Sequence, residues 1–282
     1  YLIYFIFTFI KKGYYLPWRF ILWIFYLPKY FSQKIKFDKS AKVSNTKILY
    51  KRQFPVYVPY SEKQSVNRHY WIQDIWAARK VDDLACSKLA KENISLKNSS
   101  NLLNHLDIGS SVKQFVFSIL TNQKVKLSFG DINYPSYLEK ISPEYSPTYF
   151  KVDLQNLSTG ALSEFDSVSS LHVIEHLGLG KYGDKIDANG HLLVLEKMFY
   201  AMKPLSSFLV SFPISSKPGV IFNAARDCCP LEMISHAKNI GWIIEDSSLI
   251  EDNWEAVNFD EENFKSKNVN YGCLLLHLIK PG

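Results

Sequence analysis

The stretch Leu102-Leu103-Asn104-His105-Leu106-Asp107-Ile108-Gly109-Ser110-Ser111 decides the fold. Its first half is short and apolar, which is typical of a buried strand, and it ends in an acid and a glycine turn. Residues 112–120 then place apolar side chains at i, i+3, i+4, i+7 and i+8, the spacing of a helix that buries one face. A strand, a glycine turn and a helix predict a loop whose backbone N–H groups approach a ligand.

Strands and helices alternate along the rest of the chain. The apolar patterns predict strands over 124–129, 149–152, 165–171 and 208–212, helices over 69–89, 192–202 and 231–240, and a final strand pair over 242–249 and 273–279. This alternation predicts an α/β, Rossmann-like fold with a mostly parallel sheet and helices on both faces. Ligands of such folds bind at the carboxyl ends of the strands.

The N-terminal 52 residues differ in charge from the body. They hold 11 of the 33 Lys and Arg and one of the 27 acids, which leaves 22 basic and 26 acidic residues in the rest. Residues 1–10 and 14–27 are apolar and aromatic, and each run is shorter than the ~20 residues that cross a bilayer. We therefore predict a helical extension over 1–60 that can lie on an anionic membrane surface, with 34–59 as a linker or irregular arm. Packing of these aromatic side chains on the body is the alternative.

The body, 61–282, is expected to be one domain in the cytoplasm. The four cysteines lack paired spacing, which favours reduced thiols over a disulfide framework. No nucleic-acid partner is expected.

Two acids follow the second and third predicted strands. Asp131 is placed to accept hydrogen bonds from ribose hydroxyls, and Asp153 can reach an adenine amino group. Each acid could instead begin a loop or cap a helix.

This order of motifs, completed by the stretch 165–176 and by Met202-Lys203-Pro204, resembles class I S-adenosylmethionine-dependent methyltransferases over 102–276. The resemblance implies S-adenosylmethionine as the cofactor. By position, it implies that the cofactor contacts are Asp107, Gly109, Ser110, Asp131, Asp153, Leu154 and Ser170.

Three longer stretches, 69–76, 172–184 and 222–226, resemble the domain of unknown function 268 family, which is itself methyltransferase-like. Two features depart from these patterns. Ser111 and Lys113 stand where the methyltransferase loop has its second and third glycines, and Ala225 stands where the closer family is expected to have a histidine. A non-catalytic binding or scaffold protein that keeps the fold is therefore an alternative function.

The segment His172-Val173-Ile174-Glu175-His176 carries the strongest chemical signal. On a helix, this spacing would place both histidines on one face with the glutamate beside them, as in inverted zinc peptidases. A metal-dependent hydrolase is thus a third hypothesis, with Glu251 as a further ligand, although we assign no metal. The same segment suits methyl transfer, in which a base takes a proton from a hydroxyl acceptor. The candidate catalytic residues are His172, Glu175, His176 and Asp184.

Glycines at 178, 180 and 183 predict a loop that is either flexible or tightly turned and that forms a rim or lid facing the substrate. Lys181 and Tyr182 on this loop, with Asn223 and Arg226 after the fifth strand, are the candidate substrate-binding residues. Arg226 could hold an anionic group or form a surface salt bridge. The acceptor is expected to be a small molecule, with a sugar or glycan precursor as the suggestion.

Overall fold

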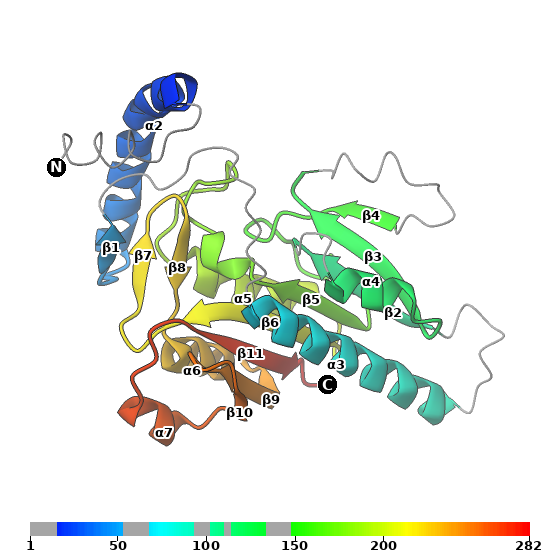
Figure 1. Cartoon of the computed structure of the whole chain (residues 1–282). Helices are drawn as coiled ribbons and strands as arrows, with labels where there is room; N and C mark the ends of the chain where they lie inside the picture. Colours follow the sequence, from blue (N-terminus) through cyan, green and yellow to red (C-terminus); the bar gives the residue numbers. More distant parts are fainter. Residues whose placement is uncertain (1–15, 53–67, 93–101, 110–113, 134–147) are drawn as a thin grey trace.

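We describe a computed structural model over residues 16–52, 68–92, 102–109, 114–133 and 148–282 (Figure 1). An eight-stranded sheet forms its centre, in the order β10-β9-β11-β6-β5-β2-β3-β4. The strands are β2 (Leu103–Ile108), β3 (Val125–Asp131), β4 (Thr148–Lys151), β5 (Ser167–Leu171), β6 (Ser207–Ile214), β9 (Ile243–Ile250), β10 (Ala256–Asn258) and β11 (Gly272–Ile279).

The five strands of this sheet that come first along the chain, β2 to β6, run parallel. β2 pairs with β3 and β5, β3 pairs with β4, and β5 pairs with β6, all in parallel register. β11 is antiparallel to both β6 and β9, and it lies between them. This is a doubly wound order with one antiparallel strand inserted near its end. The predicted Rossmann-like fold of the class I methyltransferase type is therefore confirmed.

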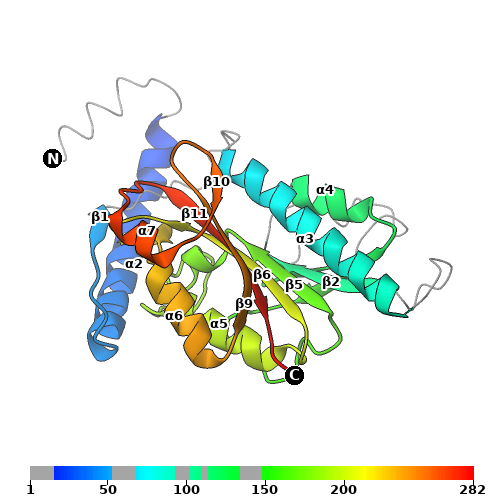
Figure 2. The ribbon, with the colours of Figure 1, turned by 90° about the horizontal axis from the view of Figure 1, so that it is seen from below.

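Helices cover both faces of the sheet (Figure 2). α3 (Arg68–Glu92) and α4 (Gln114–Leu120) pack on one face, where a cluster of buried side chains includes Val81 and Phe115. α5 (Gly190–Ala201) and α6 (Pro230–Ile240) pack on the other, where the cluster includes Met198 and Met233. α6 ends at Gly241, which has φ +113° and so adopts the left-handed conformation that favours glycine. α7 (Glu261–Ser266) lies outside these layers.

The central strands are buried on both faces, and this explains why their sequences are continuously apolar or small. All eight residues of β6 and all five of β5 are buried. Strands of this kind occur in parallel sheets whose two faces are covered by helices. Because β2, β3, β4 and β5 are parallel, their carboxyl ends meet at one edge of the sheet, where the loops that follow them converge.

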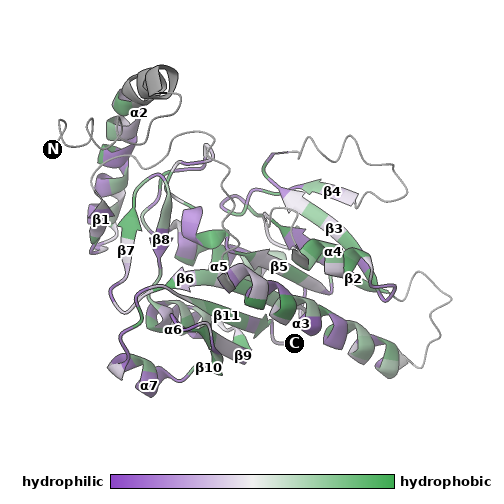
Figure 3. Ribbon diagram, in the orientation of Figure 1, coloured by the Kyte–Doolittle hydropathy of each residue, from purple (hydrophilic) through white to green (hydrophobic). Residues whose placement is uncertain are grey.

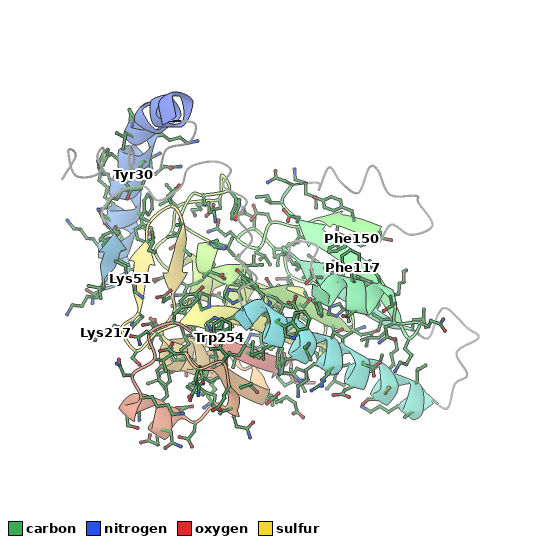
Figure 4. All side chains as sticks on the ribbon, viewed as in Figure 1. Tyr30, Lys51, Phe117, Phe150, Lys217 and Trp254 are labelled. Carbon is green, nitrogen blue, oxygen red and sulfur yellow. The ribbon has the colours of Figure 1, made fainter. Side chains whose placement is uncertain are left out.

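The N-terminal segment packs against the body. α2 (Leu16–Val43) ends near β1 (Tyr50–Arg52), which pairs in parallel with β7 (Gly219–Ile221). β7 also pairs with β8 (Ala225–Asp227), which completes a three-stranded sheet. Lys51 of β1, which is labelled in Figure 4, forms an ion pair with Asp227 of β8.

The prediction of a linker or irregular arm over 34–59 is wrong for residues 34–43, which belong to α2, and for 50–52, which form β1. Residues 44–49 between them are irregular, and 53–59 lie outside the described residues. Tyr30 and Phe37 of α2 are fully buried, and their rings lie 5.5 and 5.1 Å from the ring of Phe222. Since Phe222 is far away in the sequence, no local pattern could reveal this packing. The boundary near residue 60 also falls outside the described residues and stays a prediction. None of the helices in the described ranges combines the length and apolarity that crossing a bilayer requires.

Replacing Phe37 with alanine tests whether α2 belongs to the folded body. We expect Phe37→Ala to lower the free energy of unfolding by about 3–5 kcal/mol, because it removes a buried aromatic ring. The matched control is Phe31→Ala on the same helix, where the ring is 45% exposed and the expected change is within about 0.5 kcal/mol. Urea denaturation followed by circular dichroism measures both. Equal effects of the two variants would contradict the observed packing.

Candidate functional site

A cavity of about 660 Å³ opens at the carboxyl ends of β2, β3, β4 and β5. This volume lies within the range of about 300–1,000 Å³ that is typical of ligand sites. Nine of the residues that the sequence predicted for the site line it together: Gly109, Asp131, Asp153, Leu154, His172, His176, Lys181, Tyr182 and Asp184.

Gly109 makes the turn after β2. Its φ is +73°, and its N–H donates a hydrogen bond to the carbonyl of Gly130 at 2.8 Å. A Cβ atom at this position would lie 2.9 Å from Cγ1 of Val173, closer than real side chains approach. Both the backbone conformation and the packing therefore require glycine here. Ser110, Ser111 and Lys113 lie outside the described residues.

Asp131, the last residue of β3, and Asp153, two residues after β4, both line the cavity. Oδ1 of Asp131 accepts a hydrogen bond from the backbone N–H of Asn133 at 3.0 Å. Asp153 begins the loop after β4, and its two oxygens accept from the N–H of Gln155 at 3.0 Å and from Nδ2 of Asn156 at 2.7 Å. Within the described residues, Oδ2 of Asp131 has no such partner, so Asp131 is better placed to accept from a ligand.

Asp107 and Ser170 lie in the interior of the sheet and do not line the cavity. Asp107 accepts a hydrogen bond from the hydroxyl of Ser169 at 2.6 Å, and this hydroxyl also lies 3.0 Å from Nε2 of His105. The placement suits a residue that holds β2 and β5 in position below the glycine turn. It does not support the direct cofactor contact that the resemblance implied for either residue.

The segment 172–176 forms an ion-paired cluster at the end of β5. Nδ1 of His172 lies 3.0 Å from Oε1 of Glu175, and Nε2 of His176 lies 3.7 Å from the same oxygen. Nε2 of His172 is 3.4 Å from Sγ of Cys273 on β11. Glu175 is only 2% exposed, so its carboxylate is buried between the two imidazole rings. A buried carboxylate is stable when it is paired in this way.

The surroundings of the two histidines shift their pKa values in opposite directions. Burial alone would lower the pKa of His172, but Cys273 and Glu175 raise this pKa above its usual range. For His176, burial outweighs the effect of Glu175 and lowers the pKa. Burial would raise the pKa of Glu175, but His176 and His172 lower it, so the carboxylate stays ionised. These opposite shifts favour the cationic form of His172 and the neutral form of His176.

His176 is the residue that can act as a base. Its Nδ1 donates to the carbonyl of Ala224 at 2.6 Å, which leaves Nε2 with the lone pair. His172 has both ring nitrogens engaged, and its backbone has φ +54°, an uncommon conformation for a residue other than glycine. The contact with His176 uses only the carbonyl of Ala224, so it does not depend on the side chain at position 225.

The zinc-peptidase interpretation of this segment assumed an α-helix. Only Ile174–His176 is helical, as a single 3-10 turn (η3), and His172 precedes it. The two histidines therefore do not project from successive turns of a helix. Among the described residues, no group of three or more His, Cys, Asp or Glu side chains is arranged to hold a metal ion.

Asp184 holds the loop Gly178–Asp184, which we call the rim loop. Its Oδ2 accepts from the N–H groups of Gly178 at 2.8 Å and Gly180 at 3.1 Å, and its Oδ1 accepts from the N–H of Tyr182 at 3.1 Å. The prediction that Asp184 serves as a base is not supported, because three backbone donors already occupy the carboxylate. Lys181 and Tyr182 line the cavity from this loop, with the Lys181 Nζ 4.9 Å from the centre of the Tyr182 ring.

Asn223 and Arg226 are buried and do not line the cavity. Arg226 donates to the carbonyls of Ala188 at 2.7 Å and Leu177 at 2.5 Å, and it also contacts His191. Arg226 thus connects the residue after η3 with the segment before α5, and these two points flank the rim loop. Neither substrate contact nor a surface salt bridge fits this placement.

Three residues of α3 complete the cavity: Tyr70, Gln73 and Asp74. The ring of Tyr70 lies 4.6 Å from that of His172. Gln73 accepts a hydrogen bond from the hydroxyl of Ser211 at 2.6 Å. All three lie in the predicted helix 69–89 and in the family-like stretch 69–76, but none of them was assigned to the site from the sequence, which gave no signal for Cys273 either.

The fold and the cavity define an α/β protein of the class I methyltransferase-like type. The model of a family described as "Caenorhabditis protein of unknown function, DUF268" matches residues 111–272, and the chain belongs to this family. No curated protein sequence matches the chain.

Solved structures with a similar fold include three methyltransferases. Phosphoethanolamine N-methyltransferase 2 from Haemonchus contortus, in complex with S-adenosylhomocysteine, is 14% identical with a TM-score of 0.46, and the match covers 79% of this chain and 61% of that enzyme. The chain thus spans about three fifths of its length. A 1,6-didemethyltoxoflavin-N1-methyltransferase from Burkholderia thailandensis is 14% identical with a TM-score of 0.46, over 84% of this chain and all of that one. N-methyltransferase NodS from Bradyrhizobium japonicum is 14% identical with a TM-score of 0.45, and the match covers 75% of this chain and 98% of that one.

The protonation states can be measured by ¹⁵N NMR of the histidine rings, assigned with His172→Asn and His176→Asn. At pH 7 we expect His172 to be protonated on both nitrogens and His176 to carry its proton on Nδ1 alone. Glu175→Gln should lower the pKa of both rings, because it removes the negative charge that favours their cations. A neutral His172 at pH 7 in the wild-type protein would contradict this assignment.

Proposed function

We propose that this chain transfers a methyl group from S-adenosylmethionine to a hydroxyl-bearing acceptor. The observation that carries the proposal is the meeting of two sets of residues in one cavity. Gly109, Asp131 and Asp153 line it at the ends of successive strands, and His176 lines it with an unprotonated ring nitrogen.

The residues on the strand ends fit the cofactor. Oδ2 of Asp131 can accept hydrogen bonds from ribose hydroxyls, and Val152 and Leu154 offer apolar surface for an adenine ring. The turn at Gly109 lets the backbone approach the amino-acid part. When bound, S-adenosylmethionine would supply a methyl group on a sulfonium, and the electrons of the broken C–S bond would stay on sulfur.

The acceptor proton would pass to Nε2 of His176. As the acceptor oxygen forms its bond to the methyl carbon, it must lose this proton, and a neutral imidazole within reach can take it. The imidazolium that results would lie 3.7 Å from the Glu175 carboxylate, which stabilises the new charge. His172 keeps Glu175 ionised and in place, so it acts through its neighbour.

The acceptor would enter between the rim loop and α3. Tyr70 and Tyr182 provide aromatic rings on this side, and Lys181 provides a positive charge. Aromatic faces and a cation suit a sugar or glycan precursor that carries an anionic group. We place this reaction in the cytoplasm, with peripheral attachment to a membrane.

Cofactor binding is tested by calorimetry with S-adenosylhomocysteine. We expect Asp131→Asn to weaken the affinity about 10- to 100-fold, because it removes a charged acceptor of ribose hydrogen bonds. The matched control is Asp83→Asn, an exposed acid on α3 away from the cavity, which should bind like the wild type. Absence of binding by the wild-type protein at millimolar ligand would reject the proposed function.

The base is tested by single-turnover transfer of a radiolabelled methyl group to a mixture of sugar and glycan-precursor alcohols. We expect His176→Gln to slow transfer about 10²- to 10⁴-fold, the usual contribution of a general base. Its affinity for S-adenosylhomocysteine should stay unchanged, since His176 does not contact the ribose side. Tight cofactor binding without transfer to any hydroxyl would favour the binding or scaffold alternative.

A further inference from the structure

The side of α2 that faces away from the body carries both apolar side chains and lysines. At 100° per residue, its exposed residues fall on one side of the helix, opposite the buried Tyr30, Phe37 and Ala41. We call this surface the outer face of α2; it consists of Lys29, Phe31, Ile35, Lys36, Lys39, Lys42 and Val43. Figure 3 shows hydrophobic and hydrophilic residues alternating along this helix.

The apolar members of the outer face are well exposed to solvent. Phe31 is 45%, Ile35 57% and Val43 91% exposed. Phe31 and Ile35 are one turn apart, so they form a continuous apolar strip. The loop after α2 adds Leu49, which is 58% exposed.

Among the described residues, no acid forms an ion pair with the lysines of the outer face. Asp38 is the only acid in residues 1–52, and its carboxylate contacts Nζ of Lys34 at 3.3 Å and the hydroxyl of Tyr50. Lys29, Lys36, Lys39 and Lys42 form no ion pair with any described residue. An anionic partner would therefore meet four lysines without competition from a carboxylate of this face.

We propose that the outer face of α2 docks on an anionic phospholipid bilayer. Exposed aromatic and aliphatic side chains beside lysines are the composition of helices that lie in the membrane interface. The apolar chains would enter the headgroup region, and the lysines would pair with lipid phosphates and carboxylates. A nucleic acid would match the lysines but would offer no apolar region to Phe31 and Ile35, so lipid is favoured.

The buried side of the same helix supports the rim loop. Leu179 packs in one cluster with Tyr30 and Phe37, and a Cβ atom on Gly180 would lie 3.1 Å from Nε2 of Gln33. Lys181 and Tyr182 follow directly in the sequence. The rim loop thus lies about one helix diameter, ~10 Å, from the docking surface. If the proposed function holds, on which this step rests, the acceptor site is within reach of a sugar carried at the membrane surface.

Vesicle flotation of the full chain tests the docking. We compare vesicles of phosphatidylcholine with vesicles that also contain phosphatidylserine, using the wild type, the triple variant K36Q/K39Q/K42Q and the double variant F31S/I35S. The matched control is K126Q/K151Q/K217Q, which removes three exposed lysines of the body that form no ion pair with any described residue.

We expect the wild type to bind the anionic vesicles and to lose binding at high salt. The α2 triple variant should bind about 100-fold more weakly, since each lysine near an anionic surface contributes about fivefold. The F31S/I35S variant should also bind more weakly, while the control should match the wild type. Equal loss in the control, wild-type binding by the α2 triple variant, or tighter binding of the wild type to a DNA duplex than to the vesicles would each overturn the proposal.

Calorimetry with S-adenosylhomocysteine separates this proposal from the proposed function. The outer face of α2 does not line the cavity, so its variants should keep the wild-type affinity for this ligand. Flotation without ligand binding would leave the docking intact and reject the methyl transfer. Ligand binding without flotation would reject the docking and leave the proposed methyl transfer intact.

Discussion

The buried carboxylate of Glu175 and its two histidine partners set the chemistry of the cavity. An ionised carboxylate that is 2% exposed requires a positive partner, and His172 supplies it. Because Cys273 and Glu175 favour the cation of His172, this ring is poorly suited to take a proton from a substrate. In the proposed reaction that role falls to His176, whose Nδ1 is fixed by the carbonyl of Ala224 and whose Nε2 carries the lone pair in the neutral ring. One ion pair therefore assigns distinct roles to two histidines only four residues apart.

The fold was largely predictable because its central strands are continuous apolar or small runs bounded by turns. The acids at the ends of β3 and β4 were found for the same reason, since a strand end is visible in the sequence and its edge of the sheet is fixed by parallel pairing. α2 was misread over its second half because what stabilises it there is Phe222, about 190 residues away. The basic, polar composition after residue 34 suggested an irregular arm, whereas packing against the body stabilises a helix there.

The roles of individual polar residues were harder to predict because spacing does not give the direction of a side chain. Asp184 and Arg226 were chosen for their charge and their place near the site. Each instead forms hydrogen bonds with the backbone. Asp184 accepts from three N–H groups of the rim loop, and Arg226 donates to the carbonyls of Leu177 and Ala188. Tightly turned glycine loops leave many backbone groups unpaired, and nearby charged side chains satisfy them.

A chain of hydrogen bonds joins the two ends of the cavity. The N–H of His172 donates to the hydroxyl of Ser211 at 3.1 Å, this hydroxyl donates to Gln73 at 2.6 Å, and Gln73 donates to Asp74 at 3.1 Å. Asp74 in turn accepts from the N–H of Phe115, at the start of α4, at 3.4 Å. The helix that follows the glycine turn is thus held by α3, and so is the backbone of His172.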